Sequence, residues 1–516
     1  MKHSTCLLFA LASAPLVFSA QPKRPNIVIF LADDLGYADV GVQGCRDIPT
    51  PHLDSIARNG VRFTDGYATH PVCSPSRAGL MSGSYQHRFG FEHNSGPERF
   101  ADPNFGLPRS VPTLAEKLKA AGYATGMVGK WHIGFQPGLR PHERGFDFHF
   151  GFLSGAHTYL PGKADNDPLL RNGEPVRDEK DYLTDAFARE AVAFLDRSRD
   201  RPFFLYVAFN AVHSPMEATA AYSNRFPGLT GTRRTYAGML SALDDAVGRV
   251  LGKVRELGQA ENTLVFFYSD NGGPTPQTTS RNDPLRGFKA QLFEGGIRVP
   301  FLAQWPGAIP AGQVYREMVM GFDCHATALA AAGVEVPQDK PLDGVNLLPY
   351  FTGKATGRPH EQLFWRAGPQ HAARVGDWKL VSVRGSAPQL FNLRDDIGET
   401  RDLATANPTK LRELQTAYAE WAKGTEPARW IRQDGRTAGK ADAAKSKKGG
   451  ATAGPAGSRL EETFRAADRN GDGKLSREEY PQPAIFDAVD ANRDGFATLE
   501  EVRAYFAARR GKAAKE

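Results

Sequence analysis

Polar side chains that bind metal ions or transfer protons follow four apolar runs of this 516-residue chain. Asp33 and Asp34 follow the run 27–31, and Asp270 and Asn271 follow the run 264–268. The other two sets are Lys130 with His132 after the run 123–128, and Asn210 with His213 after the run 203–209. Carboxylate and amide oxygens are hard ligands that suit Ca²⁺, and histidine is the commonest general base. The pattern predicts an active site with a bound cation, against the plainer alternative of capping or solvated loop carboxylates.

The apolar runs are rich in β-branched and aromatic residues and are nearly continuous rather than alternating. Such runs are typical of strands buried on both faces of a parallel sheet. Helix-like stretches lie between them at 113–121, 183–196 and 235–257. This alternation predicts an α/β fold with a large, mostly parallel sheet flanked by helices. Ligands bind beyond the carboxyl ends of the strands in such sheets, so we expect the four polar sets to share one crevice.

A smaller unit is expected after about Pro349, where strand-like pieces at 378–383 and 389–392 precede a helix at 408–423. We expect an antiparallel α+β subdomain over 349–436, packed on a catalytic domain over 21–348. Residues 437–457 are rich in Ala, Gly, Lys and Ser, a composition that predicts a flexible linker.

Two loops with calcium-ligand spacing follow the linker, within 458–510. An EF-hand loop uses oxygens at positions 1, 3, 5 and 12, the backbone carbonyl at position 7 and Gly at position 6. At the ligand positions the two loops carry Asp468, Asn470, Asp472, Lys474 and Glu479, then Asp490, Asn492, Asp494, Phe496 and Glu501. Two such loops in tandem predict a helical EF-hand pair for up to two Ca²⁺ and an unknown partner, against a degenerate acidic turn.

The N-terminus has the pattern of an export signal. Lys2 and His3 precede an apolar run at 7–18 that ends at the small residues Ser19 and Ala20. This pattern is typical of a secretory signal over 1–20, and neither this run nor any later one is long enough to span a membrane. We therefore expect a secreted or periplasmic protein without a transmembrane segment.

The net charge of +6 comes from 64 basic and 58 acidic side chains. The excess lies in the linker and in the last eight residues, where basic side chains are solvated. No broad cationic face is implied, so the charge pattern argues against a nucleic-acid partner.

Export leaves three cysteines, Cys45, Cys73 and Cys324. Oxidising compartments favour disulfides, so an odd number needs an explanation. A Cys45–Cys324 bridge and three separate buried thiols are the simple alternatives. The third alternative is that Cys73 does not remain a cysteine.

The segment Cys73-Ser74-Pro75-Ser76-Arg77, followed by Ser82-Gly83, resembles the signature of the formylglycine-dependent (type I) sulfatases. Ser82 replaces a Thr of that signature. A second family signature is matched in full by Gly122-Tyr123-Ala124-Thr125-Gly126-Met127-Val128-Gly129-Lys130-Trp131-His132. Further matching segments are 31–37, 269–273 and 294–300. The resemblance covers about 24–403 and implies an alkaline-phosphatase-like fold.

For Cys73 the resemblance implies oxidation to formylglycine by a formylglycine-generating enzyme that acts on the unfolded chain. One hydroxyl of the hydrated aldehyde attacks sulfur and displaces the alcohol. The second hydroxyl, once deprotonated, expels sulfate and restores the aldehyde. This covalent route divides one difficult hydrolysis into two easier steps. The alternative is an ordinary buried or disulfide-bonded cysteine.

The resemblance also implies roles for the polar sets. Asp33, Asp34, Asp270 and Asn271 hold Ca²⁺ together with the nucleophile derived from Cys73. Arg77 and Lys130 match residues that orient and stabilise the aldehyde hydrate, and His132 matches the base for its second hydroxyl. His213 matches the histidine beside the leaving oxygen, and Lys289 matches the sulfate-binding lysine. Val212 and Phe288 depart from the residues usual beside these two.

We expect an exported sulfuric ester hydrolase that acts on a sulfated polysaccharide or oligosaccharide. The candidates for a sugar pocket, each with a surface or packing role as the alternative, are His87, Arg88, His93, His157, Tyr159 and Arg366. One alternative function is a phosphodiester or phosphonate monoester hydrolase of the same fold. The other is a calcium-dependent, non-catalytic binding protein.

Overall fold

The computed structural model describes residues 24–96, 102, 104–162, 167–337, 342–430, 464, 467–468, 470, 472–477, 479–480 and 486–512. The expected export signal, 1–20, and the expected linker, 437–457, lie outside these residues. The chain divides into two compact units, Met1–Gly435 and Arg436–Glu516. Within the described residues, no helix combines the length and apolar character that a membrane span needs.

A ten-stranded sheet forms the centre of the first unit, with the strand order β11-β2-β10-β9-β1-β8-β4-β5-β6-β7. Its four middle strands are the four predicted apolar runs: β9 (Thr263–Ser269), β1 (Asn26–Ala32), β8 (Phe203–Ala208) and β4 (Ala124–Lys130). These four strands are parallel to one another. Their carboxyl ends therefore meet at one edge, as the polar sets predicted.

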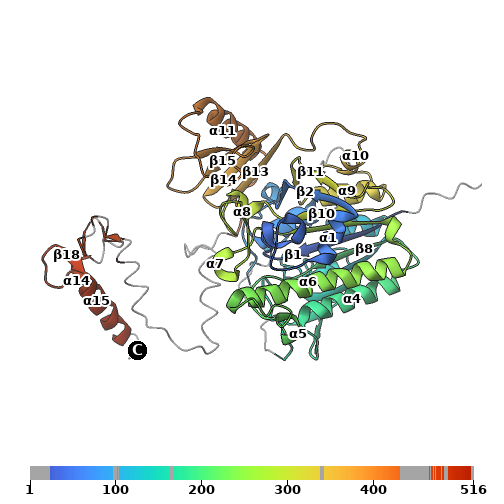
Figure 1. The fold of residues 1–516 in the computed structure, drawn as a ribbon, viewed down its shortest axis with the longest axis horizontal. Helices are drawn as coiled ribbons and strands as arrows, with labels where there is room; N and C mark the ends of the chain where they lie inside the picture. Colours follow the sequence, from blue (N-terminus) through green and yellow to red (C-terminus); the bar gives the residue numbers. More distant parts are fainter. Residues whose placement is uncertain are drawn as a thin grey trace, which may run out of the picture. The chain divides into compact units, whose positions relative to one another are not determined.

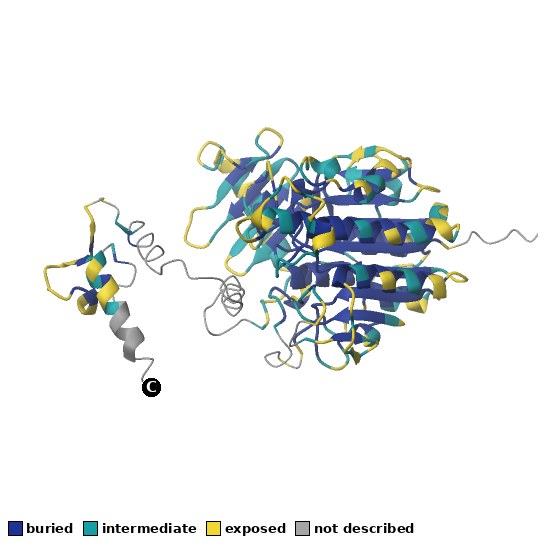
Figure 2. Cartoon of the chain, turned by 60° about the horizontal axis from the view of Figure 1, so that its bottom comes forward, coloured by how far each residue is buried: buried dark blue, intermediate teal, exposed yellow. Residues whose placement is uncertain are grey.

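Successive residues of β1 point to opposite faces of the sheet, and both faces are buried. Val28 and Phe30 lie in one core with helices α1 (Pro51–Arg58), α4 (Leu183–Arg197) and α6 (Gly231–Glu256). Ile27 and Ile29 lie in a second core with α2 (Cys73–Ser82), α3 (Leu114–Ala120) and α9 (Asp323–Ala331). Figure 1 shows α4 and α6 side by side below the sheet, and Figure 2 shows the buried strands between the helical layers. The continuous apolar runs follow from this two-sided burial.

Shorter elements complete the first unit. The outer strands of the large sheet are β2 (Gly60–Phe63), β5 (Phe148–Phe152), β6 (Leu169–Arg171), β7 (Glu174–Val176), β10 (Phe301–Gln304) and β11 (Gln313–Tyr315). A two-stranded sheet and four short helices are β3 (Gly66–Tyr67), β12 (Val319–Met320), α5 (Ala220–Ser223), α7 (Thr275–Thr278), α8 (Glu294–Ile297) and α10 (Leu348–Phe351).

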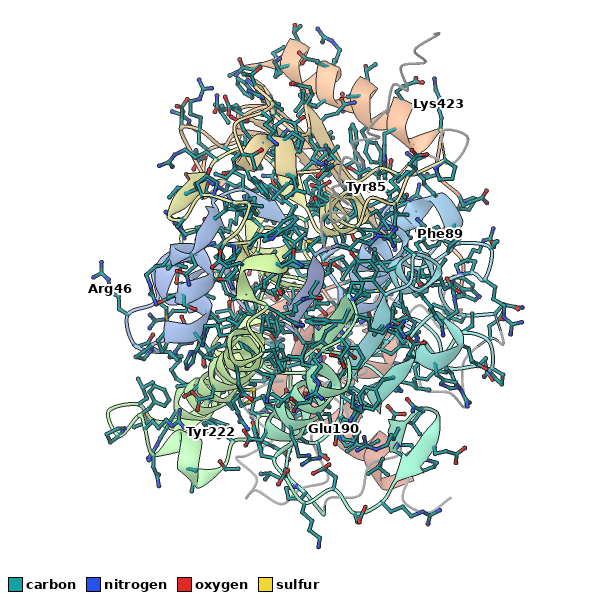
Figure 3. The ribbon with its side chains drawn as sticks, turned by 90° about the vertical axis from the view of Figure 1, so that its right-hand side faces the viewer. Arg46, Tyr85, Phe89, Glu190, Tyr222 and Lys423 are labelled. Atoms are coloured by element: carbon teal, nitrogen blue, oxygen red, sulfur yellow. The ribbon has the colours of Figure 1, made fainter. Side chains whose placement is uncertain are left out.

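The expected smaller subdomain is a four-stranded antiparallel sheet with one helix. Its elements are β13 (Gln362–Ala367), β14 (Gln370–Val375), β15 (Trp378–Ser382), β16 (Gln389–Asn392) and α11 (Pro408–Ala422). One face of this sheet packs on α11, and the other face packs on Tyr85 and neighbouring side chains of the large domain. Figure 3 labels Lys423 at the end of α11 and Tyr85 below it, at the border with the large domain.

The second unit contains a two-stranded sheet, β17 (Lys474–Ser476) with β18 (Phe496–Thr498), and helices α14 (Phe486–Val489) and α15 (Leu499–Lys512). The two strands are the inner parts of the two predicted calcium loops, and they pair in antiparallel fashion through Leu475 and Ala497. A small apolar core lies beneath them.

The three cysteines of the described residues are free thiols. Of the alternatives left open by the sequence, the Cys45–Cys324 bridge is therefore wrong. Cys45 packs against the α1, α4 and α6 face of the large sheet, whereas Cys324 lies in α9 on the opposite face. The sheet itself separates the two sulfur atoms, a relationship that the number of cysteines cannot reveal.

Candidate active site

The four predicted polar sets meet at the carboxyl edge of the four middle strands. Leu31 of β1 is in register with Ala208 of β8 and Tyr268 of β9, so the residues that follow each strand leave the sheet at the same level. Asp33 and Asp270 are fully buried at this edge. The site is therefore fixed by the strands and by the loops directly after them.

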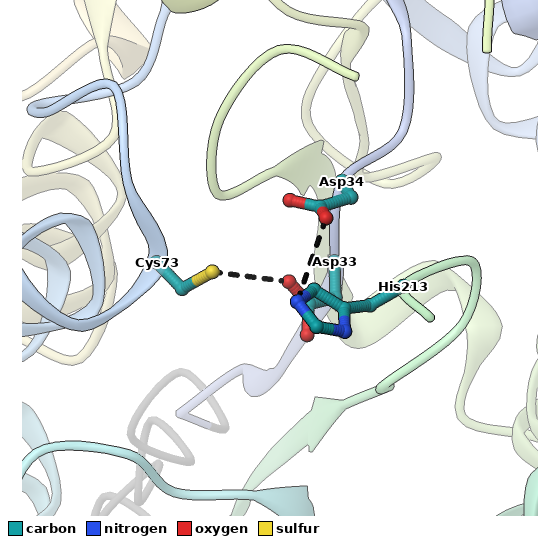
Figure 4. Close-up of side chains that lie close together, drawn as sticks. All are labelled: Asp33, Asp34, Cys73 and His213. Carbon is teal, nitrogen blue, oxygen red and sulfur yellow. Dashed lines mark hydrogen bonds and ion pairs between the residues drawn. The ribbon is translucent and has the colours of Figure 1, made fainter. Parts of the chain in front are cut away.

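Cys73 is the first residue of α2 and is 1% exposed. Its Sγ lies 3.4 Å from Oδ1 of Asp33, as Figure 4 shows. The first turn of α2 is fixed from outside the helix, because Asn94 accepts the Ser74 N–H at 3.0 Å and the Ser74 hydroxyl donates to the carbonyl of His132. These contacts direct the Cys73 side chain toward the carboxylates at the strand edge.

Asp33 lies between two buried cations. Lys130 Nζ is 2.5 Å from Asp33 Oδ2, and Arg77 Nη2 is 3.7 Å from the same oxygen. Burial raises the pKa of Asp33, but the attraction of Lys130, His213 and Arg77 outweighs burial and holds this pKa far below its usual range. Asp33 is therefore an anion in the folded protein.

Arg77 links the carboxylates to the strand ends. Its Nε and Nη2 donate to Oδ2 of Asp270 at 2.9 and 2.7 Å, and its Nη1 donates to the Lys130 carbonyl at 2.8 Å. A guanidinium with three hydrogen bonds to two acceptors has little freedom to turn. Arg77 thus fixes the relative positions of the loops that follow β4 and β9.

Asp34 collects the other site residues around its carboxylate, with its backbone in the left-handed region at φ 64°. Lys289 Nζ lies 2.8 Å from Asp34, Asn271 Nδ2 donates to Oδ1 at 2.7 Å, and His213 Nε2 is 3.6 Å from Oδ2. Figure 4 shows His213 facing Asp34 and Asp33 across the site. Asp34 holds the pKa of Lys289 well above its usual range although burial opposes this.

The donor set fits a calcium ion. Oδ1 of Asn271 is buried and has no hydrogen-bond partner among the described residues, while its amide nitrogen donates to Asp34. One ligand atom each of Asp33, Asp34, Cys73 and His213 lies within 4.8 Å of the others. Burial and the nearby Asp33 raise the pKa of Asp270 to about 7. Crowded carboxylates and an unused amide oxygen are the surroundings expected for a hard divalent cation.

Two histidines stand beside the carboxylates. His132 adopts a left-handed backbone at φ 61°, its Nε2 is 3.1 Å from the Ser95 carbonyl oxygen, and its buried Nδ1 has no partner among the described residues. Burial, with Lys130 and Arg77 nearby, lowers the His132 pKa far below its usual range. His213 pairs through Nδ1 with the Ser214 carbonyl oxygen at 2.6 Å. Burial and Lys289 lower the pKa of His213 as well.

Of the residues proposed for a sugar pocket, Tyr159 borders the site, because its hydroxyl donates to the His213 carbonyl at 2.7 Å. His87 is 0% exposed and hydrogen-bonds through Nε2 to the Arg366 carbonyl. The Arg366 side chain pairs with Glu92, its Nε 3.0 Å from Oε1. His157 packs on Phe152. Sugar contact by these residues stays a prediction.

The supporting residues were not singled out from the sequence. Asn94 and Ser95 hold the first turn of α2 and His132, and Glu294, Lys379 and Glu399 form a buried ionic cluster behind the Lys289 loop. Lys379 gave a signal that was overlooked, because it is a charged residue inside an otherwise apolar strand sequence. Such local inconsistencies mark functional positions.

Comparisons with known proteins agree with this geometry. The family model described as Sulfatase matches residues 25–334, and the model described as N-sulphoglucosamine sulphohydrolase, C-terminal, matches residues 288–413. An EF hand model matches residues 460–480 and 484–507. The sulfatase model alone spans more than half of the chain.

Relatives and solved structures agree with the family models. N-acetylgalactosamine-6-sulfatase of Sus scrofa is 38% identical over 395 residues, covering 72% of this chain and 74% of that protein. A crystal structure of Ps i-CgsB in complex with k-i-k-neocarrahexaose is 37% identical with a TM-score of 0.76, covering 80% of this chain and 96% of that one. PsFucS1 sulfatase from Pseudoalteromonas sp. is 25% identical with a TM-score of 0.68, covering 78% and 90%. The chain therefore belongs to the sulfatase family and is a sulfuric ester hydrolase with a C-terminal EF-hand region.

Proposed function

We propose that this sulfatase removes sulfate from a sulfated polysaccharide or oligosaccharide, with a formylglycine nucleophile made from Cys73 and a bound Ca²⁺. One observation carries the proposal: Cys73 Sγ lies against Asp33 inside a ring of buried carboxylates, lysines and histidines. Two similar proteins support a carbohydrate substrate: one is an N-acetylgalactosamine-6-sulfatase, and the other has a crystal structure in complex with a neocarrahexaose.

The charges of the site favour a sulfate ester. Even when all three are ionised, the carboxylates Asp33, Asp34 and Asp270 carry no more negative charges than the cations Arg77, Lys130 and Lys289 carry positive ones. Asp33, Asp34, Asp270 and Asn271 would hold Ca²⁺, and the chemistry that a bound Ca²⁺ would supply is polarisation of a sulfate oxygen and activation of the hydroxyl nucleophile. The charge of the ion would also leave the site positive, as an anionic substrate requires.

Cys73 Sγ marks the position where the hydroxyls of the aldehyde hydrate would stand. Lys130 reaches Asp33 beside this position, and Arg77 fixes the loops around it, so both hold positive charge where the transition state gains negative charge. Lys289 is held at Asp34 by its ammonium group and is available to the remaining sulfate oxygens. These cations are preorganised, since they are already paired in the free enzyme.

The two histidines suit proton transfer. A lowered pKa keeps His132 neutral, and its Nδ1, which has no partner in the described part of the chain, can accept the proton of the second hydroxyl. His213 presents Nε2 to the site while its Nδ1 donates to the Ser214 carbonyl, so Nε2 of the neutral ring carries no proton. Nε2 can therefore take the proton that the attacking hydroxyl releases and then deliver it to the leaving oxygen. This division assigns one histidine to each of the two steps.

Burial of Cys73 supports maturation before folding. A side chain that is 1% exposed is closed to a modifying enzyme. We infer that a formylglycine-generating enzyme acts on the unfolded chain during export to the periplasm or the outside of the cell.

We also propose that the two EF-hand loops each hold Ca²⁺. Glu479 accepts from Ser476, and Glu501 accepts from Thr498, so each loop positions its twelfth residue against its own strand. The pairing of β17 with β18 joins the two loops, as in a compact EF-hand pair.

The test begins with the mass of the tryptic peptide 63–77 from protein made in its own host. A mass that matches an aldehyde in place of the Cys73 thiol supports the nucleophile, and an intact thiol in active protein rejects it. Sulfate release is then measured on sulfated glycans. Matched phosphate esters serve as controls, and faster turnover of the phosphate esters would overturn the assignment.

A further inference from the structure

A fully buried ionic cluster lies where the antiparallel subdomain meets the catalytic domain. Lys379 Nζ is 2.7 Å from Oε1 of Glu294 and 2.8 Å from Oε1 of Glu399, and all three side chains are 0% exposed. Lys379 lies on β15 of the small sheet, whereas Glu294 begins α8. The chemistry proposed above uses none of these residues.

The cluster holds both ends of the loop 285–296, which carries Lys289. At one end Arg286 Nη1 donates to the Glu399 carbonyl at 2.9 Å. At the other end the backbone N–H of Glu294 donates to Oε2 of Glu399 at 2.7 Å. The two ends are joined by the Gly295 N–H, which donates to the Arg286 carbonyl at 2.7 Å. Lys289 lies between these fixed points and reaches Asp34 at 2.8 Å.

The same loop also contacts the metal-ligand segment. The Gly296 carbonyl accepts the backbone N–H of Gly272 at 3.0 Å, directly after Asn271. A Cβ on Gly295 or Gly296 would lie within 2.3 Å of backbone oxygens of the loop, so the loop closes tightly on itself. A displacement at Glu294 therefore passes to Lys289 and to the Asn271 segment together.

The positive charge of Lys379 stabilises the buried carboxylates Glu294 and Glu399 in the interior. The positive charges of Arg298 and Arg374 neutralise the negative charges of Glu294 and Asp65. Lys379 is then the cation that neutralises Glu399. Without Lys379, Glu294 and Glu399 would remain as two close buried carboxylates with one cation too few. Like charges in the interior repel strongly, and the loop would move to separate or hydrate them.

We propose that Lys379 of the small subdomain is a positioning residue for catalysis: through Glu294 and Glu399 it holds the loop 285–296 so that Lys289 meets the substrate sulfate. In this arrangement a side chain of the small subdomain, which does not contact substrate, fixes the position of an active-site lysine. The inference rests on the proposed function for the role of Lys289.

A double-mutant cycle tests this inference. Lys379→Met, Lys289→Ala and the double variant are compared with wild type on one sulfate ester, with Cys73 conversion checked by mass in each. Lys379→Met is expected to lower kcat/KM by about 10- to 100-fold, chiefly through KM, because small displacements of a positioned group have effects of this size. In the Lys289→Ala background the same change is expected to have an effect about fivefold smaller than in wild type, with the remainder arising at the Asn271 segment. Additive effects would overturn the proposal.

Control variants separate positioning from stability. Leu414→Ala removes a fully buried side chain on the α11 face of the same small sheet, and it is expected to lower Tm without changing kcat/KM. If Lys379→Met does not fold, Lys379→Met with Glu399→Gln restores the charge balance while still releasing the loop, and it enters the same cycle.

Hydrogen exchange distinguishes failure of this inference from failure of the proposed function. Amides of 285–296 are expected to exchange faster in Lys379→Met than in Leu414→Ala. Unchanged exchange would overturn the positioning role. Faster exchange together with full activity of Lys289→Ala would instead show that Lys289 does not take part in the reaction. Lys379 would then have no catalytic residue to position.

Discussion

Two lysines reach two adjacent carboxylates from opposite sides of this site. Lys130 pairs with Asp33 and Lys289 pairs with Asp34, so each carboxylate keeps one cation close to the place where sulfate must bind. Adjacent aspartates would repel each other if both were unpaired and buried. The lysines therefore stabilise the resting site in addition to the roles proposed for them in the reaction.

At the residue scale, Lys130→Ala is expected to lower kcat by about 100- to 1,000-fold, the usual effect of removing one preorganised charge at a developing anion. Calcium affinity is expected to rise, since the cation beside Asp33 is gone. Steady-state kinetics and calcium titration check both effects. Lys119→Ala, which removes an exposed lysine paired with Asp147, is the matched control and should leave both unchanged.

A pH-dependent contribution to stability is expected from His360. Its Nε2 lies 2.9 Å from both oxygens of Asp323. Burial lowers the His360 pKa, but the attraction of Asp323 outweighs burial and raises this pKa above 6.5. A histidine with a raised pKa stabilises the fold at low pH, and this stability is lost as pH rises through the folded-state value.

His360→Gln is therefore expected to lower the free energy of unfolding more below pH 6.5 than well above it. Denaturant titrations of both proteins on either side of that pH measure the difference. An equal loss of stability at both pH values would show that the ion pair does not form.

At the scale of elements, the sequence predicted the four middle strands and the helices α3, α4, α6 and α11 well. Two-sided burial imposes continuous apolar runs, and these are visible in a single sequence. The strands β13 and β14 were not predicted, because β13 mixes exposed, buried and half-buried positions and contains Arg366. Lys379 was predicted only as part of a strand, since its partners lie far away in the sequence.

The active site likewise contains some residues that could be placed from the sequence and others that could not. Residues that follow the four strands could be placed together from topology alone, because parallel strands bring their carboxyl ends to one edge. Roles for Lys289 and His213 came from the family resemblance. The contacts of Asn94, Ser95 and Glu399 could not be predicted, since they depend on how loops from distant segments pack against α2 and α8.

The chain segment 424–430 contacts the loop that supports His132. Trp430 stacks on Phe105 with ring centroids 4.7 Å apart, and the backbone N–H of Glu426 donates to the His87 carbonyl at 2.8 Å. Residues a few positions further along that loop, Asn94 and Ser95, hold Ser74 and His132. The segment is thus coupled to the site through one loop.

Trp430→Ala is expected to lower the free energy of unfolding by about 1–2 kcal/mol through lost burial. It is also expected to lower kcat/KM by about tenfold, through displacement of His132. Thermal unfolding and steady-state kinetics measure the two effects. Trp305→Ala, a change at a half-buried tryptophan that donates to the Glu261 carbonyl, should lower stability alone. Equal kinetics for the two variants would contradict the coupling.

At the scale of the whole molecule, the carboxylate site and the EF-hand loops belong to separate compact units with separate cores. Glu479→Gln with Glu501→Gln in the full chain is expected to remove the two EF-hand calcium ions while leaving kcat unchanged. Asp270→Asn is expected to do the reverse, with activity lost and the EF-hand ions retained. Metal analysis alongside sulfate release measures both outcomes, and lost activity in the first variant would show that the units are coupled.

The burial of Cys73 also limits the time during which its thiol is accessible to a modifying enzyme. The surroundings of Cys73 are incomplete until Asp270 has been synthesised, because Asp270 accepts the hydrogen bonds from Nε and Nη2 of Arg77. The 197 residues between positions 73 and 270 take roughly 10–40 s to make at about 5–20 residues per second. Within that interval the thiol is accessible, and afterwards the fold encloses it. A host that supplies the modifying enzyme too slowly would accumulate a stable, correctly folded protein that no later treatment of the native state can activate.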